Sequence, residues 1–293
     1  MKTAPQRAHA AALPDARGLR IPERTLELLR DLIASHAGMH YDDGRLEILR
    51  DRIVPLAIER GFDSLLDYYY LLKYDTLAAS EWPRVMDALS VQETYFWREI
   101  DQLRALVDEI VPVLAKAGDP VRIWCVPCAS GEEPLSLAML LDEAGWFDRA
   151  RIEIHASDAS ASAIARARAG RFRERSFRTL PPALRAKHFT ADGDTWVVDP
   201  ALHARVRSWS VVNLMCHGDV SLYARVPVIV CRNVFIYFSP EAITRVARTF
   251  AGAMPTPAYL CIGASESLLK LRTPFDLREI GGAFVYVKDD RHA

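Results

Sequence analysis

The sequence predicts an α/β protein in which an all-helical domain precedes a Rossmann-like domain built on a doubly wound sheet. Apolar residues recur at helical spacing through residues 25–88, where glycines punctuate the pattern. Farther along, residues 121–134 read as a strand, a loop of small residues and the start of a helix, and a second strand follows at residues 152–156. A chain of 293 residues with 50% hydrophobic content is also long enough for about two domains.

The first 22 residues predict a flexible N-terminal tail. They are rich in Ala, Pro and Arg but contain no sustained apolar core, so they fit neither a signal peptide nor a membrane span. No later apolar run approaches the roughly 20 residues that a spanning helix needs. Five cysteines suit a reducing compartment, and a net charge of -1 gives no reason to expect nucleic acid. We therefore expect a cytoplasmic monomer without membrane insertion or a nucleic-acid partner.

Residues 23–88 predict a small helical domain. Three apolar series at helical spacing follow one another, and glycines separate them. The series are Leu26, Leu29 and Ile33, then Leu46, Leu49, Ile53 and Leu56, then Leu65, Tyr68 and Leu72.

The loop after the first predicted strand, residues 128–131, is the expected ligand site. Ligands of open α/β sheets bind beyond the carboxyl ends of the strands. A dinucleotide turn needs several glycines, whereas this loop has only Gly131. Glu132 and Glu133 also stand where phosphates would lie, and like charges at short range are unfavourable. The pocket therefore suits a cation.

The second predicted strand leads into Ser157 and Asp158. An acidic residue at this position is well placed to accept hydrogen bonds from ribose hydroxyls. A positively charged nucleoside fits both loops, and S-adenosyl-L-methionine (SAM) is such a molecule, with a sulfonium, an ammonium and an unphosphorylated ribose. The alternative is that Asp158 only caps the helix that runs through Ile164.

Cys125 and Cys128 form a CVPC pattern. A zinc site needs about four ligands, and no second pair of comparable spacing exists, so we expect no metal. A reactive thiol prefers a cationic neighbour, whereas the residues that follow are acidic. Two small core residues are the favoured interpretation, with a redox role as the alternative.

Several sequence blocks, in order from about Leu26 to Lys288, resemble the chemotaxis receptor methyltransferase (CheR) family. The resemblance implies a class I SAM-dependent methyltransferase domain at residues 89–293, with a small antiparallel β-subdomain inserted at about residues 172–206. The most specific blocks are QETYFWRE at residues 92–99, CASGEEP at 128–134 and VIVCRNVFIYFSPE at 228–241, and the others include GMHYDDGRLEILRDRI at 38–53, SDASASAIARARAGRF at 157–172 and VVNL at 211–214.

The activity that the resemblance implies is protein-glutamate O-methylation on the cytoplasmic domain of a methyl-accepting chemoreceptor. A receptor Glu would attack the methyl group of SAM, leaving S-adenosyl-L-homocysteine as product. A carboxylate with a pKa near about 4.3 is already ionised at neutral pH, so no general base is required. Two alternatives stay open: a SAM-binding regulatory protein with little turnover, and a methyltransferase of another acidic substrate, such as a small carboxylic acid.

The resemblance also assigns site residues by motif position. Arg98 and Tyr237 are the expected catalytic residues, although Tyr237 also fits a core aromatic and Arg232 a structural ion pair. The family usually has Asn where this chain has Gln92. The expected cofactor-binding residues are Gln92, Thr94, Arg98, Glu132, Asp158, Asn213, Leu214, Arg232 and Asn233.

Two basic segments bear on a protein partner. In the family, the second helix carries basic residues that meet the receptor, and this chain keeps Arg45, Arg50 and Arg52 but then departs from the pattern at residues 55–57. Residues 166–187 carry eight basic residues against Glu174 alone. This strip is a solvated helix face or a surface that attracts an acidic protein, and nucleic acid is the less favoured third alternative because aromatic residues are few here.

Overall fold

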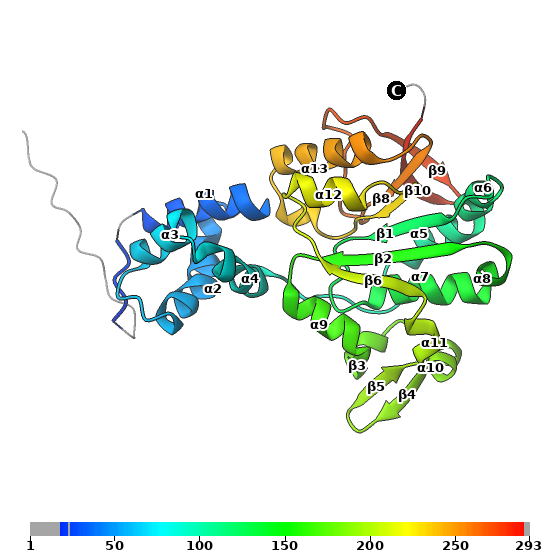
Figure 1. Cartoon of the computed structure of the whole chain (residues 1–293), viewed down its shortest axis with the longest axis horizontal. Coiled ribbons are helices and arrows are strands. Elements are labelled where there is room, and N and C mark those ends of the chain that lie inside the picture. Colours follow the sequence, from blue (N-terminus) through cyan, green and yellow to red (C-terminus); the bar gives the residue numbers. More distant parts are fainter. Residues whose placement is uncertain (1–17, 23, 290–293) are drawn as a thin grey trace, which may run out of the picture. The chain divides into compact units, whose positions relative to one another are not determined.

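The computed structural model describes residues 18–22 and 24–289, which form two compact units that divide after Leu89 (Figure 1). Each unit has its own core. In the described part of the chain, no helix is both long and apolar enough to cross a membrane.

The named elements of the first unit are all helices. Its helices are amphipathic, and the apolar series read from the sequence supply the buried face, including Leu29, Ile33, Leu49 and Ile53. The predicted tail lies outside the described residues up to position 17, whereas Leu19 is buried and Arg20 forms a β-bridge with Ser64. The elements are α1 Thr25–Ala37, η1 Asp43–Arg45, α2 Leu46–Glu59, α3 Leu65–Tyr74 and α4 Ala78–Leu89.

Helix α2 continues through the segment where the chain departs from the family pattern. Pro55 lies inside the helix, while Leu56 and Ala57 are buried. Arg52 donates a hydrogen bond to the backbone carbonyl of Ala88 at 2.8 Å. Two of the three replacements, Leu56 and Ala57, therefore serve the core of the helical unit, whereas Pro55 is exposed.

The second unit is built on a seven-stranded sheet with the order β6-β2-β1-β7-β8-β10-β9. Strands β6, β2, β1, β7 and β8 are parallel, and β10 is antiparallel to both of its neighbours. The strand order reverses between β1 and β7, which places a ligand crevice at the carboxyl ends of these strands. The strands are β1 Val121–Cys125, β2 Ile152–Asp158, β6 Val206–Val211, β7 Val228–Val230, β8 Ala258–Cys261, β9 Asp276–Ile280 and β10 Ala283–Lys288.

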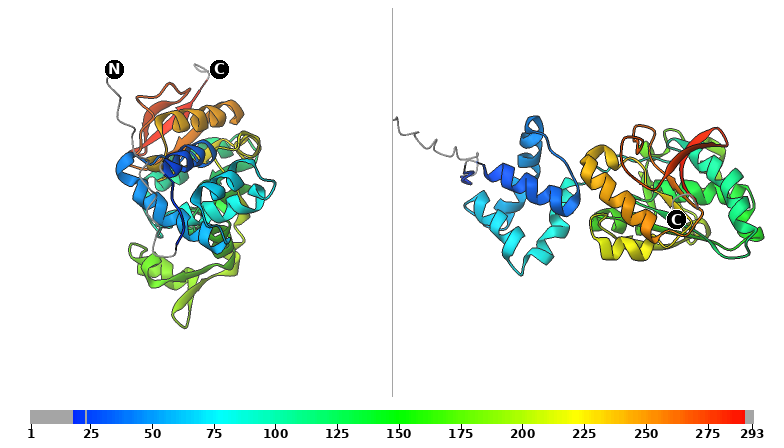
Figure 2. Two further views of the ribbon diagram at one scale, coloured as in Figure 1. Left: turned by 90° about the vertical axis from the view of Figure 1, so that its left-hand side faces the viewer. Right: turned by 90° about the horizontal axis from the view of Figure 1, so that it is seen from above.

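Helices cover both faces of this sheet because successive strand residues point to opposite sides. On β1, Ile123 packs into the core beneath α7, whereas Trp124 packs into the core beneath α13 with Phe250. Figure 2 shows the helical layers from two further directions. The helices are α5 Ile100–Ala105, η2 Leu106–Ile110, α6 Val111–Ala115, α7 Glu132–Glu143, α8 Trp146–Arg149, α9 Ala161–Ala169, α12 His217–Tyr223, η4 Phe235–Tyr237 and α13 Pro240–Ala253.

A small antiparallel sheet with the order β3-β5-β4 is inserted between α9 and β6 (Figures 1 and 2). Gly193, at φ 61°, lies in the two-residue turn between β4 and β5. The predicted fold class, an all-helical domain followed by a Rossmann-like domain with an inserted antiparallel β-subdomain, is confirmed. The inserted elements are β3 Arg171–Arg173, η3 Glu174–Phe177, α10 Pro182–His188, β4 Phe189–Asp192, β5 Thr195–Val198 and α11 Pro200–His203.

Candidate functional site

The loops that follow β1 and β6 are both joined by backbone hydrogen bonds to the last two residues of β2, at the carboxyl edge of the sheet. Cys128 N donates to Ser157 O at 2.8 Å, and Val212 N donates to Asp158 O at 2.9 Å. The two loops and the end of β2 therefore form one continuous rim.

Asp158 fixes the loop after β1. Its Oδ2 accepts the backbone N–H of Ala129 at 2.9 Å, and its Oδ1 accepts the N–H of Ser160 at 2.9 Å. The cap of α9 is Ser160, whose hydroxyl accepts the N–H of Ala163 at 3.0 Å. The interpretation of Asp158 as the helix cap is therefore wrong.

Gly131 lets this loop pass close to the neighbouring strand. It has φ 101°, and a Cβ atom placed on it would lie 3.0 Å from Cη2 of Trp209 on β6. Only glycine combines that backbone angle with that approach.

Unusual backbone angles gather at this site. Among the described residues, five non-glycine residues have positive φ, and four of them are Trp97 at 70°, Glu99 at 46°, Ala129 at 47° and Asn233 at 59°. Such conformations cost free energy and persist only where the surroundings fix them, which is typical of functional sites.

Arg232, at the end of β7, fixes the loop that carries Arg98. Its Nε donates to Oε2 of Glu133 at 2.7 Å, while Nη1 and Nη2 donate to the backbone carbonyls of Glu99 and Arg98 at 2.8 and 2.7 Å. Arg232 is 3% exposed. It therefore forms the structural ion pair that was its alternative role, and its three donor groups are all engaged by the chain.

Arg98 is less constrained than Arg232. Its Nη1 donates to Glu93 O at 2.9 Å, and its guanidinium carbon lies 5.7 Å from the ring centre of Tyr95. Its Nε lies 3.8 Å from Oε1 of Glu99, beyond hydrogen-bonding distance. The half-buried guanidinium thus keeps donors available for a ligand.

Glu99 links this loop to Asn233. It accepts hydrogen bonds from Ala264 N at 3.0 Å and from Asn233 Nδ2 at 3.2 Å. Although burial opposes the effect, these hydrogen bonds lower the pKa of Glu99. Its carboxylate is therefore a weak base at neutral pH.

Glu266 is a positioning residue that the sequence analysis did not identify. Its Oε1 accepts the N–H of Phe235 at 2.6 Å, and its Oε2 accepts the N–H groups of Asn233 at 2.9 Å and Gly263 at 2.6 Å. One carboxylate therefore holds the turn that leads from the end of β7 to Tyr237. The sequence gives little sign of Glu266, because a side chain that accepts backbone N–H groups has no characteristic spacing from its partners in the sequence.

Gln92, Thr94 and Glu132 line one cavity of about 410 Å³. Glu132 is 2% exposed, and its two oxygens accept hydrogen bonds from the hydroxyls of Ser176 at 2.9 Å and Ser130 at 2.8 Å. Burial raises the pKa of Glu132, and the two serine hydroxyls oppose that effect. Arginines of the inserted subdomain and of α9 complete the wall: Arg166, Arg171, Arg173 and Arg175.

The remaining predicted residues lie on the loops after β6 and β7, outside the lining of that cavity. Asn213 accepts the N–H of Met215 at 3.0 Å through its side-chain oxygen, and Leu214 is buried. Tyr237 ends η4 and is half-buried, and its hydroxyl has no hydrogen-bond partner in the described part of the chain.

Three buried polar atoms at the site have no partner among the described residues. They are Oε1 of Gln92, Oε1 of Glu133 and Nε1 of Trp97. Two are acceptors and one is a donor, which fits a ligand that carries both a cationic donor and an anionic acceptor. The amino-acid end of SAM carries an ammonium and a carboxylate, so the chemistry of these atoms fits that group, and Gln92 is the one of the three residues that lines the cavity described above.

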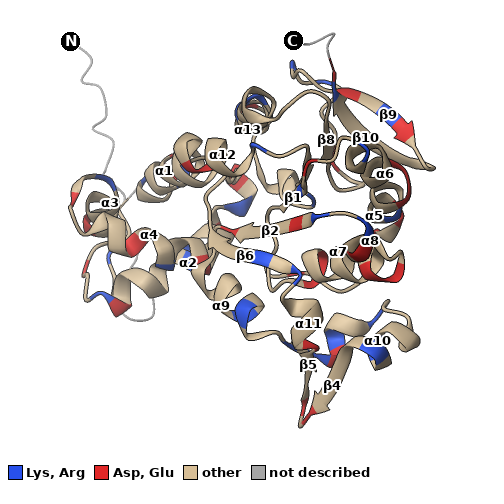
Figure 3. Cartoon of the chain, turned by 45° about the vertical axis from the view of Figure 1, so that its right-hand side comes forward, with Lys and Arg blue, Asp and Glu red and all other residues tan. Residues whose placement is uncertain are grey.

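The basic strip at residues 166–187 is largely engaged within the unit. Figure 3 shows basic segments on α9 and α10, with acidic segments near those of α10. Only part of the strip therefore offers free charge to a partner. The internal pairs are Arg171 with Asp192, Arg178 with Glu93, Arg185 with Glu174, and Lys187 with Asp142 and Glu143.

Comparison with known proteins matches both units. Residues 24–90 match the family model described as CheR methyltransferase, all-alpha domain, and residues 92–282 match that described as CheR methyltransferase, SAM binding domain. Chemotaxis protein methyltransferase 2 of Vibrio cholerae is 31% identical over 265 residues, which covers 88% of this chain and 91% of the relative. Chemotaxis protein methyltransferase 1 of Pseudomonas aeruginosa is 29% identical over 268 residues, covering 89% and 96%. The solved magnesium protoporphyrin IX methyltransferase from Synechocystis aligns with a TM-score of 0.35 at 14% identity, over 75% of this chain and 94% of that one.

Proposed function

The chain belongs to the CheR methyltransferase family of SAM-dependent chemotaxis methyltransferases, and we propose that it methylates glutamate side chains of methyl-accepting chemoreceptors. The predicted family and the predicted cofactor are thereby confirmed. The methyl acceptor and the protein partner are the proposal.

The observation that carries the proposal is that the site loops offer no His or Lys and that their carboxylates are already engaged by the chain. Residues 92–99, 128–133, 158–160, 212–215 and 231–237, all within the described ranges, contain no His or Lys. Asp158, Glu99 and Glu132 accept hydrogen bonds from the chain itself, and Glu133 is paired with Arg232. An acceptor that is already ionised at neutral pH needs no base, and a glutamate carboxylate meets that requirement.

The cofactor supplies an electrophilic methyl group on a sulfonium when it is bound. We propose that the orphaned atoms of Gln92 and Glu133 accept hydrogen bonds at its cationic end, with Thr94 and Glu132 in the adjoining wall. Asp158 would hold the ribose, and Asn213 and Leu214 would line the adenine pocket. Assigning Glu133 to this set adds one residue to the nine that motif position indicated.

We propose that Arg98 and Tyr237 act at the reacting end of the site. Arg98 has donors free for bidentate contact with a carboxylate, either that of the cofactor or that of the incoming Glu. Arg232 acts through the backbone carbonyls of Arg98 and Glu99, and Asn233 acts through the side-chain carboxylate of Glu99, so they are positioning residues. Because an anion and a cation neutralise each other in the reaction, alignment and exclusion of water are the main requirements.

We also propose the partner and the domain roles. The helical domain at 23–88 and the β-subdomain at about 172–206 would contact the receptor's cytoplasmic domain, and the domain at 89–293 would carry the chemistry. We expect the protein to act as a cytoplasmic monomer.

Mass spectrometry of receptor peptides tests the proposed acceptor. Receptor-containing membranes are incubated with SAM and the wild-type protein, and receptor peptides are searched for the mass of one added methyl group. We expect the modification on Glu, absent when that Glu is replaced by Gln. Methylation of Lys, Arg or His side chains, or of free carboxylic acids only, would overturn the glutamate assignment.

A further inference from the structure

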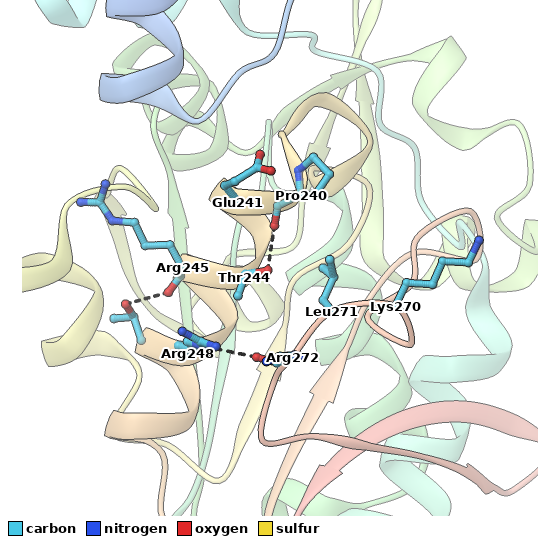
Figure 4. Close-up of a pocket in the computed structure, with 9 residues that line it drawn as sticks. Pro240, Glu241, Thr244, Arg245, Arg248, Lys270, Leu271 and Arg272 are labelled. Carbon is cyan, nitrogen blue, oxygen red and sulfur yellow. Dashed lines mark hydrogen bonds between the residues drawn. The ribbon is translucent and has the colours of Figure 1, made fainter.

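A groove runs along α13, between this helix and the segment Lys270 to Arg272 (Figure 4). Its volume is about 660 Å³. Thr244, Arg245 and Arg248 form its helical wall, while the opposite face of α13 packs into the core through residues such as Phe250. We call this surface the α13 groove.

The α13 groove continues toward α12. A second cavity of about 340 Å³ shares Arg248 and Thr249 with it and is also lined by His217, Ser221 and Arg225. Helix α13 has 14 residues, so its wall is about 21 Å long at 1.5 Å per residue. A long, open groove of this kind suits a polypeptide segment better than a compact anion.

The charge of the groove is unbalanced. Within the described part of the chain, none of its five cationic side chains forms an ion pair with a carboxylate, in contrast to the basic strip of the inserted subdomain. Glu241 is the one acidic residue in its described lining. The five cations are Arg225, Arg245, Arg248, Lys270 and Arg272.

Hydrogen bonds orient two of these arginines without neutralising them. Arg248 Nε donates to Arg272 O at 3.2 Å, and Arg245 Nη2 donates to Met215 O at 3.1 Å. Figure 4 shows the Arg248 bond spanning from α13 to the facing segment. Clustered, exposed cations repel one another, and an anionic partner relieves that repulsion.

The groove also begins next to the reacting end of the site. Pro240, the first residue of α13, lines it and lies three positions after Tyr237 in the chain. The intervening Ser239 caps α13 by accepting the N–H of Ala242 at 3.2 Å. A protein segment whose acceptor Glu is near Tyr237 can therefore extend along the groove.

We propose that the α13 groove docks an acidic segment of the methyl-accepting protein. This segment adjoins the acceptor Glu in the partner's chain. This inference rests on the proposed function and adds a specificity surface to it. The groove recognises carboxylate charge spread over several residues, and it does not contact the reacting atoms.

Fluorescence anisotropy tests the groove directly. The probe is a labelled helical peptide of Glu and Ala of roughly 20 residues, with a Gln and Ala peptide as its uncharged counterpart. The groove variant combines Arg248→Gln, Lys270→Gln and Arg272→Gln. The control variant removes the same charges elsewhere on the unit, with Arg104→Gln, Lys116→Gln and Arg207→Gln.

We expect the wild type and the control variant to bind the Glu peptide, more weakly as salt rises, and the groove variant to lose about tenfold in affinity. Equal affinity of the groove and control variants would overturn the proposal. Displacement of the peptide by micromolar inorganic pyrophosphate would also overturn it, because the surface would then be a site for a small anion.

Receptor methylation separates this proposal from the proposed function. With receptor as substrate, we expect the groove variant to raise KM severalfold while kcat and SAM affinity stay the same. If the groove variant methylates the receptor normally with an unchanged KM, the docking proposal is refuted and the proposed function is not. Peptide binding without any receptor methylation by the wild type would refute the proposed function and leave the groove as an acidic-peptide site.

Discussion

Arg232 and Glu133 form a buried ion pair, with 2.7 Å between Nε and Oε2, although they lie 99 residues apart in the sequence. The same guanidinium holds the carbonyls of Arg98 and Glu99. One side chain thus joins the start of α7, the end of β7 and the loop that carries Arg98. Burial raises the pKa of Glu133, which Arg232 opposes by its charge and hydrogen bond.

Breaking this pair should destabilise the protein strongly. Arg232→Met leaves Glu133 buried without its cation, which costs about 3–5 kcal/mol of unfolding free energy. Arg104→Met removes an exposed pair with Asp101 and should cost less than about 1 kcal/mol. Urea denaturation measures both changes. Equal losses in the two variants would show that the buried pair does not fix the fold at this site.

Glu266 should control turnover through the turn that carries Tyr237. Glu266→Gln replaces one acceptor oxygen with a donor that faces backbone N–H groups, at a cost of about 1.5–3 kcal/mol. We expect initial methyl-transfer rates to fall at least about tenfold, since about 1.4 kcal/mol corresponds to tenfold. Glu279→Gln, at an exposed position of the edge strand β9, is the control and should leave the rate unchanged. A Glu266→Gln rate equal to that of the control would contradict this role.

Gly131 should be intolerant of a side chain. Gly131→Ala places Cβ 3.0 Å from Trp209 and keeps a positive φ, whereas Gly118→Ala meets only the backbone penalty at φ 80° with nothing within 4 Å. The added overpacking should cost about 1–3 kcal/mol beyond the control. Thermal melting and SAM calorimetry measure the difference. If the two variants have comparable stability and SAM affinity, the close approach of the Gly131 loop to Trp209 on β6 is refuted.

We expect the folded protein to lose stability in mild acid because His188 is buried. Burial lowers the pKa of His188, with Lys187 adding to the effect and Asp142 and Glu143 opposing it. The unfolded chain therefore binds the proton more readily, so the stabilisation is present above about pH 6.5 and is lost as pH falls through the lowered folded pKa. We expect the melting temperature of His188→Gln to fall less than that of the wild type between neutral pH and about pH 5.5. Identical slopes for the variant and the wild type would contradict the assignment.

Local patterns were sufficient to predict the main elements. The apolar residues of β1, the small-residue loop and the helical spacing after Pro134 correspond to β1 and α7. The second strand runs two residues beyond the predicted end, because Ser157 and Asp158 pair with Ser210 and Val211 on β6. That extension depends on a partner strand about 50 residues later, which no local pattern reveals.

The site was less predictable because its contacts join distant segments. Motif position indicated Asp158 and Arg98, and the structure places Asp158 on the rim and Arg98 on the loop that Arg232 holds. Sequence reasoning left Arg232 with two roles, since the choice depends on Glu133. Glu266 went unnoticed because its partners are backbone N–H groups, which every residue except proline possesses.

Transfer of radiolabelled methyl groups from SAM to receptor-containing membranes tests the proposed function most directly. The assay compares the wild type, Arg98→Ala and the control Arg104→Ala, and alkaline treatment then releases methyl esters as methanol. We predict base-labile label with the wild type and the control, reduced about ten- to a hundredfold in Arg98→Ala as charged hydrogen bonds worth about 1.5–3 kcal/mol are lost. Base-stable label, or no transfer by a wild type that still binds SAM in calorimetry, would contradict glutamate methylation of chemoreceptors.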